Sequence, residues 1–167
     1  MLFRSEAINR DCRNPAFLPG IVLDAGIEAT VDLTEAVDGA DAVLLVVPAQ
    51  FLRAMAAQLA GVLEPGTPIV VCAKGIERVS GELMSSVVTD DCRGMPIAVL
   101  SGPTFAIEVA RGLPTAVTLA TADAALGRRL VAALGTRSFR PYLGDDPIGA
   151  QIDRKSTRLN SSHSQQS

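Results

Sequence analysis

Ala42-Val43-Leu44-Leu45-Val46-Val47 is a continuous apolar run of strand length, and Pro48 stops it. A run without polar alternation predicts a strand that is buried on both faces, as in a parallel sheet. Residues 50–63 follow with apolar side chains at helical spacing, and Pro65-Gly66 closes the segment. The positions expected on the buried side of this helix are Phe51, Met55, Leu59 and Val62. The stretch therefore predicts one strand-helix unit.

The same unit repeats toward the C-terminus. Apolar runs predict further strands at residues 69–73, 97–100, 116–120 and 139–143, and helical patterns predict helices at 80–90, 104–111 and 122–134. Ser80 and Pro103 are the expected helix starts, as an N-cap and a first-turn proline. A short strand at 29–33 and a short helix at 34–40 come earlier, and a new helix starts at Ile148. This alternation predicts the α/β class with a doubly wound, mainly parallel, Rossmann-like sheet.

Composition excludes several classes of function. Eighteen acidic residues outnumber 15 basic ones, and only 4% of residues are aromatic, so nucleic acid is not an expected partner. No apolar run reaches the roughly 20 residues of a membrane span. The three cysteines are far apart in sequence, which favours reduced thiols and a cytoplasmic location. His163 is the only histidine, and no metal-ligand spacing occurs, so no metal site is expected.

Three segments of the sequence are candidates for a ligand site. Residues 48–51, Lys74-Gly75 and residues 101–104 each follow one of the first three core strands. The carboxyl ends of parallel strands meet at one edge of a sheet, where ligands collect. Lys74 is one of only two lysines among the 15 basic residues. An ammonium beside a helix start predicts a site for a phosphate or a carboxylate.

Each of these features also has a purely structural interpretation. Gly75 could serve only as a turn residue, and Lys74 only as a cap of the sheet edge. Phe51 could be a core residue of its helix, and Pro103 an ordinary first-turn proline. Local spacing alone does not decide between these alternatives.

Six short blocks of the sequence occur in a particular order. They are Arg13-Asn14-Pro15-Ala16-Phe17-Leu18-Pro19-Gly20, Ala29-Thr30-Val31-Asp32-Leu33, Val46-Val47-Pro48-Ala49-Gln50-Phe51-Leu52-Arg53, Cys72-Ala73-Lys74-Gly75-Ile76-Glu77, Leu100-Ser101-Gly102-Pro103-Thr104-Phe105-Ala106 and Phe139-Arg140-Pro141-Tyr142. Together, over about residues 6–152, they closely resemble the bacterial NAD(P)-dependent sn-glycerol-3-phosphate dehydrogenase family. The Ala-Lys-Gly-Ile-Glu and Ser-Gly-Pro-Thr-Phe-Ala blocks are specific to that family.

The resemblance implies a reaction and a set of roles. The reaction is hydride transfer between C2 of glycerol 3-phosphate and NAD or NADP, which feeds glycerophospholipid synthesis. The resemblance assigns Lys74 to both cofactor and substrate, Gly102 and Thr104 to the substrate, and Phe51 and Ala106 to the cofactor. A positive charge near C2 favours the alkoxide through which the alcohol and the ketone interconvert by hydride transfer. The small-molecule partner is a phosphate compound, and the full-length family implies a homodimer.

Two parts of the family pattern are missing. No G-x-G-x-x-G motif, with its first strand and helix, occurs before residue 42. The family's general base is a lysine in a Gly-Gly-Ala-x-Lys-Asn setting, and Lys155 lacks those neighbours, so no catalytic residue is assigned. We expect residues 6–147 to be a partial dinucleotide-binding domain, 148–152 the start of a missing helical substrate domain, and 153–167 a disordered, non-native tail.

Three functional hypotheses follow from the sequence. The first is a truncated glycerol-3-phosphate dehydrogenase that does not turn over. The second is a short phosphate- or nucleotide-binding module without catalysis. The third is another dehydrogenase of the same superfamily that acts on a hydroxy acid. Without its first strand, the sheet has an unpaired edge, so self-association is also expected.

Overall fold

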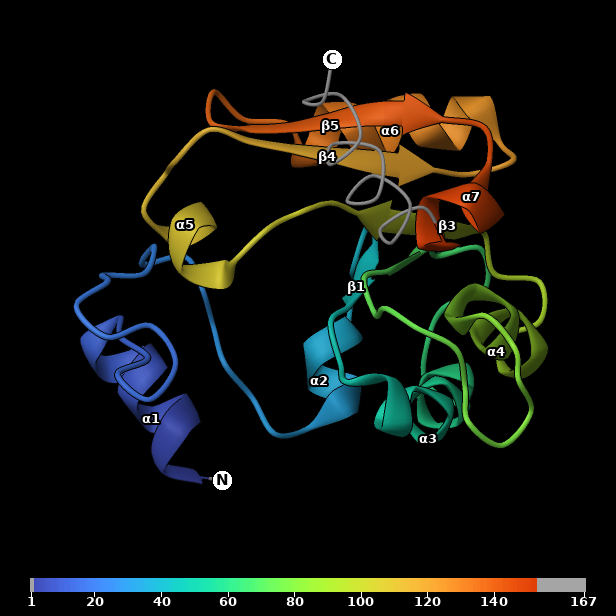
Figure 1. The fold of residues 1–167 in the computed structure, drawn as a ribbon. Helices are drawn as coiled ribbons and strands as arrows, with labels where there is room; N and C mark the ends of the chain where they lie inside the picture. The colour runs from blue at the N-terminus through green and yellow to red at the C-terminus, as the bar shows by residue number, and fades with distance from the viewer. Residues whose placement is uncertain (1, 153–167) are drawn as a thin grey trace, which may run out of the picture.

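The computed structural model of the chain describes residues 2–152 (Figure 1). The expectations for residues 153–167, which include Lys155 and His163, lie outside the described residues. The elements in chain order are α1 (Leu2–Asp11), α2 (Leu33–Val37), β1 (Val43–Leu45), α3 (Ala49–Ala60), β2 (Ile69–Val71), α4 (Met84–Asp91), β3 (Ile97–Ser101), α5 (Ala106–Ala110), β4 (Thr115–Ala120), α6 (Ala124–Leu134), β5 (Phe139–Gly144) and α7 (Pro147–Ile152).

Within residues 2–152, five strands form one sheet whose order, β1-β2-β3-β4-β5, is the order of the chain. The pairs β1-β2, β2-β3 and β4-β5 are parallel, whereas β3 and β4 are antiparallel. The predicted α/β, Rossmann-like, mainly parallel fold is confirmed. Because of the single reversal, the carboxyl ends of β1, β2 and β3 share one edge, and those of β4 and β5 lie at the opposite edge.

Helices cover both faces of the sheet. On one face, α3 and α4 pack against Leu45, Ile69 and Val71. On the other face, α6 packs against a second cluster that contains Val70 and Leu119. Ile69, Val70 and Val71 are completely buried, because successive residues of β2 point to opposite faces and both faces are covered. Burial of each such side chain contributes roughly 1.5–3 kcal/mol.

Strand β1 differs from the prediction. It has three residues, and only Leu45 among them is buried, whereas Leu44 and the following Val46 are 43% and 71% exposed. The expected burial on both faces is therefore wrong. Strand β1 pairs only with β2, and α3 and α4 cover one of its faces, so side chains on the other face remain in contact with solvent.

Helix α3 occurs where a helix was expected, but only part of the expected side faces the core: Leu59 is buried and Met55 packs against the core, whereas Val62 is 36% exposed. Its buried residues are Leu52, Ala56 and Leu59. Phe51 is 57% exposed, so its interpretation as a core residue is wrong. The apolar residues of α3 extend over more than one side of the helix. Which of them are buried therefore depends on the element that packs against α3, and that element is α4.

Two expected helix starts also differ. Helix α4 begins at Met84 because the hydroxyl of Ser80 is used elsewhere: it donates to Glu77 Oε2 (2.6 Å) and accepts from the amide of Glu82 (3.2 Å). Helix α5 begins at Ala106, so Pro103 lies in the preceding turn rather than in the first turn of the helix.

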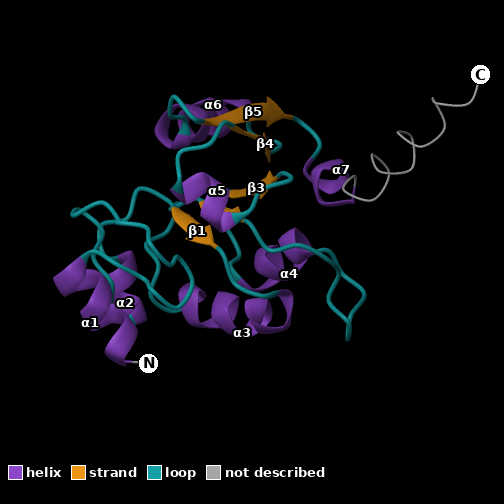
Figure 2. Cartoon of the chain, turned by 60° about the vertical axis from the view of Figure 1, so that its left-hand side comes forward, coloured by secondary structure: helices purple, strands orange, loops and turns teal. Residues whose placement is uncertain are grey.

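The N-terminal part of the described chain contains no strand at residues 29–33. The side chain of Asn9 instead pairs with both backbone groups of Ala29, at 2.9 Å from its nitrogen and 2.7 Å from its oxygen. Helix α1, which carries Asn9, lies away from the sheet in both ribbon views (Figures 1 and 2). Within residues 2–152, no helix has the length and apolarity needed to cross a bilayer.

Candidate functional site

The candidate site lies at the sheet edge where β1, β2 and β3 end. Residues 48–51 follow β1, Lys74-Gly75 follow β2, and residues 102–104 follow β3. Because these three strands are parallel neighbours, their following loops emerge on the same side. The structure therefore places the three predicted segments along one edge.

Lys74 joins two of these loops. Its Nζ donates a hydrogen bond to the backbone oxygen of Gly102, at 3.2 Å. The same oxygen accepts from the amide of Thr104, at 3.0 Å. Lys74 follows the buried Ala73 and precedes Gly75, whose φ of +114° favours glycine. The ammonium is thus held at the end of β2, next to the turn that leads into α5.

Gly102 occupies a position with no space for a side chain. A β-carbon there would lie 2.7 Å from Val117 Cγ1 and 3.1 Å from the backbone oxygen of Ala116 on β4. Glycine is therefore required by the close approach of the turn to β4, independently of any ligand. This packing also fixes the carbonyl that accepts from Lys74.

The residues predicted to contact a dinucleotide are Lys74, Phe51 and Ala106, and all three are accessible. Phe51, in the first turn of α3, is 57% exposed, and Ala106, the first residue of α5, is also exposed. Phe105 beside Ala106 is 68% exposed. An exposed aromatic side chain at a sheet edge offers a flat apolar surface to a planar ring. Phe51 and Ala106 are thus open to contact with a ligand at this edge.

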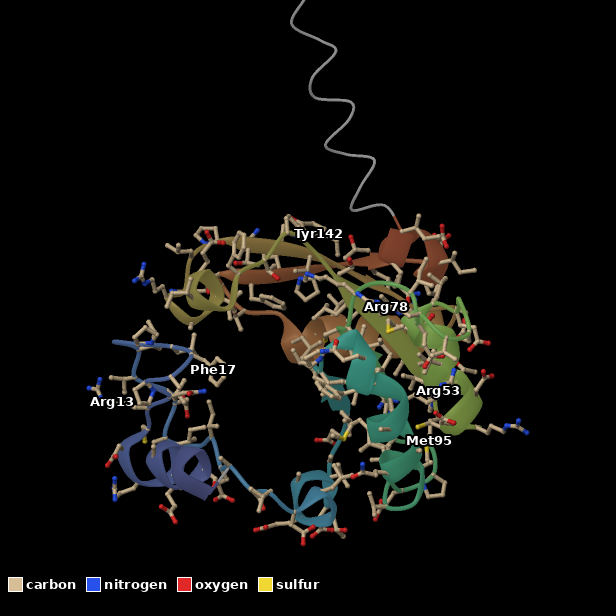
Figure 3. The ribbon with its side chains drawn as sticks, turned by 60° about the horizontal axis from the view of Figure 1, so that its bottom comes forward. Arg13, Phe17, Arg53, Arg78, Met95 and Tyr142 are labelled. Carbon is tan, nitrogen blue, oxygen red and sulfur yellow. The ribbon has the colours of Figure 1, made fainter. Side chains whose placement is uncertain are left out.

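An ion-pair cluster beside the site was missed by the sequence reasoning. Arg53 of α3 donates to Glu77 Oε1 (2.8 Å) and Oε2 (2.6 Å), and to Glu82 Oε2 (3.0 Å). Its Nη1 lies 3.9 Å from Asp91 Oδ2 on α4. Arg53 lies on the side of α3 that faces α4 (Figure 3). Arg53 and Glu77 both belong to the blocks quoted above, but 24 positions separate them, so no local spacing revealed the pair.

Hydrogen bonding controls the protonation of this cluster. The bonds from Arg53 and from the Ser80 hydroxyl lower the pKa of Glu77 from its ordinary 4.5 to about 2. The bond to Glu77 correspondingly raises the pKa of Arg53. Glu77 and Arg53 are therefore both charged at neutral pH.

Cys72 lies under the site but is not a reactive nucleophile. Burial raises the pKa of its thiol to about 11, against the opposing effect of the nearby Lys74 charge. The thiolate is the reactive form of cysteine, so Cys72 is inert at neutral pH. No cluster of three or more histidine, cysteine or acidic residues suited to a metal ion occurs in the described part of the chain.

Comparisons with known proteins identify the family. A family model described as "NAD-dependent glycerol-3-phosphate dehydrogenase N-terminus" matches residues 4–127. A glycerol-3-phosphate dehydrogenase [NAD(P)+] of Paramagnetospirillum magneticum is 63% identical over 139 residues, which are 83% of this chain and 50% of that protein. One from Rhodospirillum rubrum is 58% identical over 149 residues, 89% of this chain and 42% of that protein. The chain thus spans about half the length of these relatives.

Solved structures agree with this assignment. A glycerol-3-phosphate dehydrogenase from Coxiella burnetii has a TM-score of 0.83 and 30% identity, over 90% of this chain and 46% of that one. A 3-hydroxyisobutyrate dehydrogenase from Mycobacterium tuberculosis has a TM-score of 0.66 but only 15% identity, over 83% of this chain and 46% of that one, so it shows the fold alone. The sequence resemblance is confirmed, and the chain belongs to the family of NAD-dependent glycerol-3-phosphate dehydrogenase N-terminal regions.

Proposed function

We propose that this chain is part of an NAD(P)-dependent glycerol-3-phosphate dehydrogenase, which interconverts glycerol 3-phosphate and dihydroxyacetone phosphate for glycerophospholipid synthesis. One observation carries the proposal: Lys74 Nζ lies at 3.2 Å from the oxygen of Gly102, at the edge where β1, β2 and β3 end. An ammonium at the edge where parallel sheets bind ligands, in a chain of the matching family, supports this function.

Lys74 is the group that would act on the substrate. Its ammonium would lie beside the oxygen on C2 and stabilise the negative charge that develops there when the hydroxyl loses its proton or, in the reverse direction, when hydride adds to C2 of the ketone. Gly102 and Thr104 would contact the same substrate from the turn after β3. The carbonyl of Gly102 already orients the ammonium, so little reorganisation is needed when substrate binds.

The exposed residues at the site fit one part of the cofactor. Phe51 and Ala106 would hold a planar ring of NAD or NADP, because both are accessible at the ends of neighbouring loops. When bound, the cofactor supplies the hydride acceptor. The sequence contains no G-x-G-x-x-G motif, so we assign none of its residues to the pyrophosphate.

We further propose that this chain alone does not complete the reaction. Its relatives are about twice as long, and its other lysine, Lys155, lacks the neighbours of the family's general base. Residues 6–147 would form the partial dinucleotide-binding domain, and 148–152 the first residues of the helical substrate domain. A cytoplasmic location and a homodimer of the full-length enzyme belong to the same proposal.

Calorimetric titration of the chain with glycerol 3-phosphate and with NADH tests the proposal. We expect weak binding that Lys74→Ala abolishes and Lys155→Ala, at the chain's other lysine, leaves unchanged. Equal binding by the wild type and Lys74→Ala would show that Lys74 does not contact the ligand. Titration with 3-hydroxyisobutyrate serves as the comparison for a hydroxy-acid dehydrogenase, and no binding is expected there.

A companion assay follows NADH or NADPH oxidation with dihydroxyacetone phosphate. No turnover above the rate without protein is expected. Turnover at an ordinary enzyme rate, about 10 per second, would overturn the proposal that the chain is inactive.

A further inference from the structure

The segment that carries Lys74 has little apolar anchorage. Residues 74–83 connect β2 to α4, and Ile76 and Val79 within them are 57% and 96% exposed. The backbone bonds within this segment are local, from Gly81 N to Glu77 O (2.9 Å) and from Glu77 N to Glu82 O (2.8 Å). Local bonds shape the turn but do not fix it against the rest of the protein, so another interaction must hold it.

Arg53 provides that interaction. Its guanidinium makes two parallel hydrogen bonds to the carboxylate of Glu77 and one to Glu82, at 2.6–3.0 Å. Such two-point pairing fixes orientation as well as distance, which a lysine cannot do. The neighbouring Leu52 is completely buried, so the part of α3 that carries Arg53 is anchored in the core. The side chain of Glu77 is only 17% exposed, so solvent reaches this pair less than an ordinary surface pair.

The geometry also shows which donors of Arg53 are occupied. Glu77 and Glu82 take the donors on its Nε and Nη2, and Asp91 of α4 lies 3.9 Å from Nη1. The Nε and Nη2 donors of Arg53 are therefore engaged by the protein's own carboxylates, even though Arg53 lies only two positions after Phe51.

Lys74 lies three positions before Glu77, between two fixed points. On one side, Ala73 is buried at the end of β2, and on the other side Glu77 is held by Arg53. From this arrangement we infer that Arg53 is a positioning residue, which holds the 74–83 segment on α3 so that the Lys74 ammonium stays against the oxygen of Gly102. The importance of this position for a substrate rests on the proposed function, but the positioning itself does not.

The two lysines of the chain allow a direct test. A trace amount of acetic anhydride labels amines according to their exposure and freedom, and mass spectrometry gives the ratio of Lys74 to Lys155 labelling within one molecule. We expect Arg53→Gln to raise this ratio by at least about fivefold, because the loss of charged hydrogen bonds frees the segment. Arg53→Lys should restore part of the wild-type ratio. Arg128→Gln, at an exposed position of α6, is the matched control and should leave the ratio unchanged.

A second variant removes the same contact from the loop side. Glu77→Gln should also raise the ratio, but by less than Arg53→Gln, because Arg53 keeps its hydrogen bond to Glu82. The double variant should match Arg53→Gln, since that change already removes the pairing with Glu77. The buried thiol of Cys92 should stay protected in every variant, which separates loosening of the segment from unfolding of the chain. Wild-type ratios in both single variants, or additive effects in the double variant, would overturn the inference.

Ligand binding separates this inference from the proposed function. If the wild type binds glycerol 3-phosphate, Arg53→Gln should weaken that binding while Arg128→Gln does not. If the wild type binds neither glycerol 3-phosphate nor NADH, the proposed site fails, whereas the labelling ratio still decides whether Arg53 positions Lys74.

Discussion

Gly102 lies so close to Val117 that a β-carbon at position 102 would be 2.7 Å from Val117 Cγ1. Val117 is 5% exposed in the centre of β4, and the neighbouring backbone oxygen of Ala116 would be at 3.1 Å. The turn between β3 and α5 therefore depends on the absence of a side chain. The backbone oxygen of the same glycine accepts the hydrogen bond from Lys74. Gly102 therefore serves both the packing of the turn and the candidate site.

Gly102→Ala tests this dependence. The added methyl group must displace Val117 or shift the turn, so we expect a loss of about 1–3 kcal/mol in the free energy of unfolding, measured by urea denaturation. Gly61→Ala is the control, because a β-carbon there meets only the backbone oxygen of Gln58 at 3.6 Å, an ordinary contact. Equal stability of Gly102→Ala and the wild type would mean that the turn relaxes freely.

The stability contributed by Glu77 depends on pH in a definite direction. Its pKa is lowered from 4.5 to about 2 in the folded chain, mainly by the hydrogen bond from Arg53. The folded value is the lower one, so this contribution is fully present above pH 4.5 and is lost as pH falls toward 2. The carboxylates of Glu82 and Asp91 also face Arg53, at 3.0 and 3.9 Å, so Glu77 is not its only acidic neighbour.

Urea midpoints of the wild type and Glu77→Gln at several pH values measure this contribution. The wild type should be the more stable of the two at pH 7, and the difference should shrink between pH 4.5 and 2. Glu64→Gln, at an exposed position outside the cluster, should follow the wild type at every pH. A difference that does not change with pH would show that the glutamine variant is destabilised for another reason.

The exposed face of β1 favours self-association. Leu44 of the edge strand β1 and Val46, which directly follows that strand, are 43% and 71% exposed. Unpaired backbone groups beside exposed apolar side chains are a template for pairing with another chain. We expect Val46→Lys to lower the sedimentation coefficient measured at high protein concentration toward that of a monomer, because a lysine on an edge opposes such pairing.

Val79→Lys is the matched control for this experiment. Val79 is 96% exposed, but it lies in a loop rather than on a strand edge. Its substitution should leave self-association unchanged. Equal effects of the two lysines would indicate that net charge, and not the edge of β1, controls association.

The three thiols should react at different rates. Cys92 is 2% exposed and its Sγ donates to the oxygen of Ala56, while burial raises the pKa of Cys72 to about 11. At pH 8 we expect a thiol reagent to modify Cys12, which lies outside the core, well before the other two. Cys12→Ser should remove the fast phase, and urea should expose the remaining thiols. A fast phase that persists in this variant would place a second thiol outside the core.

The sequence predicted the fold where local pattern and tertiary packing agree. The apolar run at residues 69–73 contains β2, as predicted. Helices cover both faces of this strand, so Ile69, Val70 and Val71 are all buried. The identical pattern at residues 42–47 gave a short, half-exposed β1, since burial depends on which elements lie next to a strand. Strand order and the reversal between β3 and β4 leave no periodic signal in either strand.

The candidate site was predictable to a similar extent. The three loops could be placed at one edge from strand direction alone, and Lys74 and Gly102 do meet there. The Arg53 cluster could not be found in this way, because partners from α3, the 74–83 segment and α4 come together only in the folded chain. Ser80 was assigned to a helix cap, whereas its hydroxyl donates to Glu77, three positions earlier, in the turn before α4.

The strand order of the sheet has a consequence for synthesis. Every strand pairs with the one made just before it, at separations of about 15 to 30 positions along the chain, so no pairing waits for a distant segment. On the ribosome, each new strand therefore emerges next to a finished neighbour, and the sheet can grow in the direction of translation, one strand-helix unit at a time.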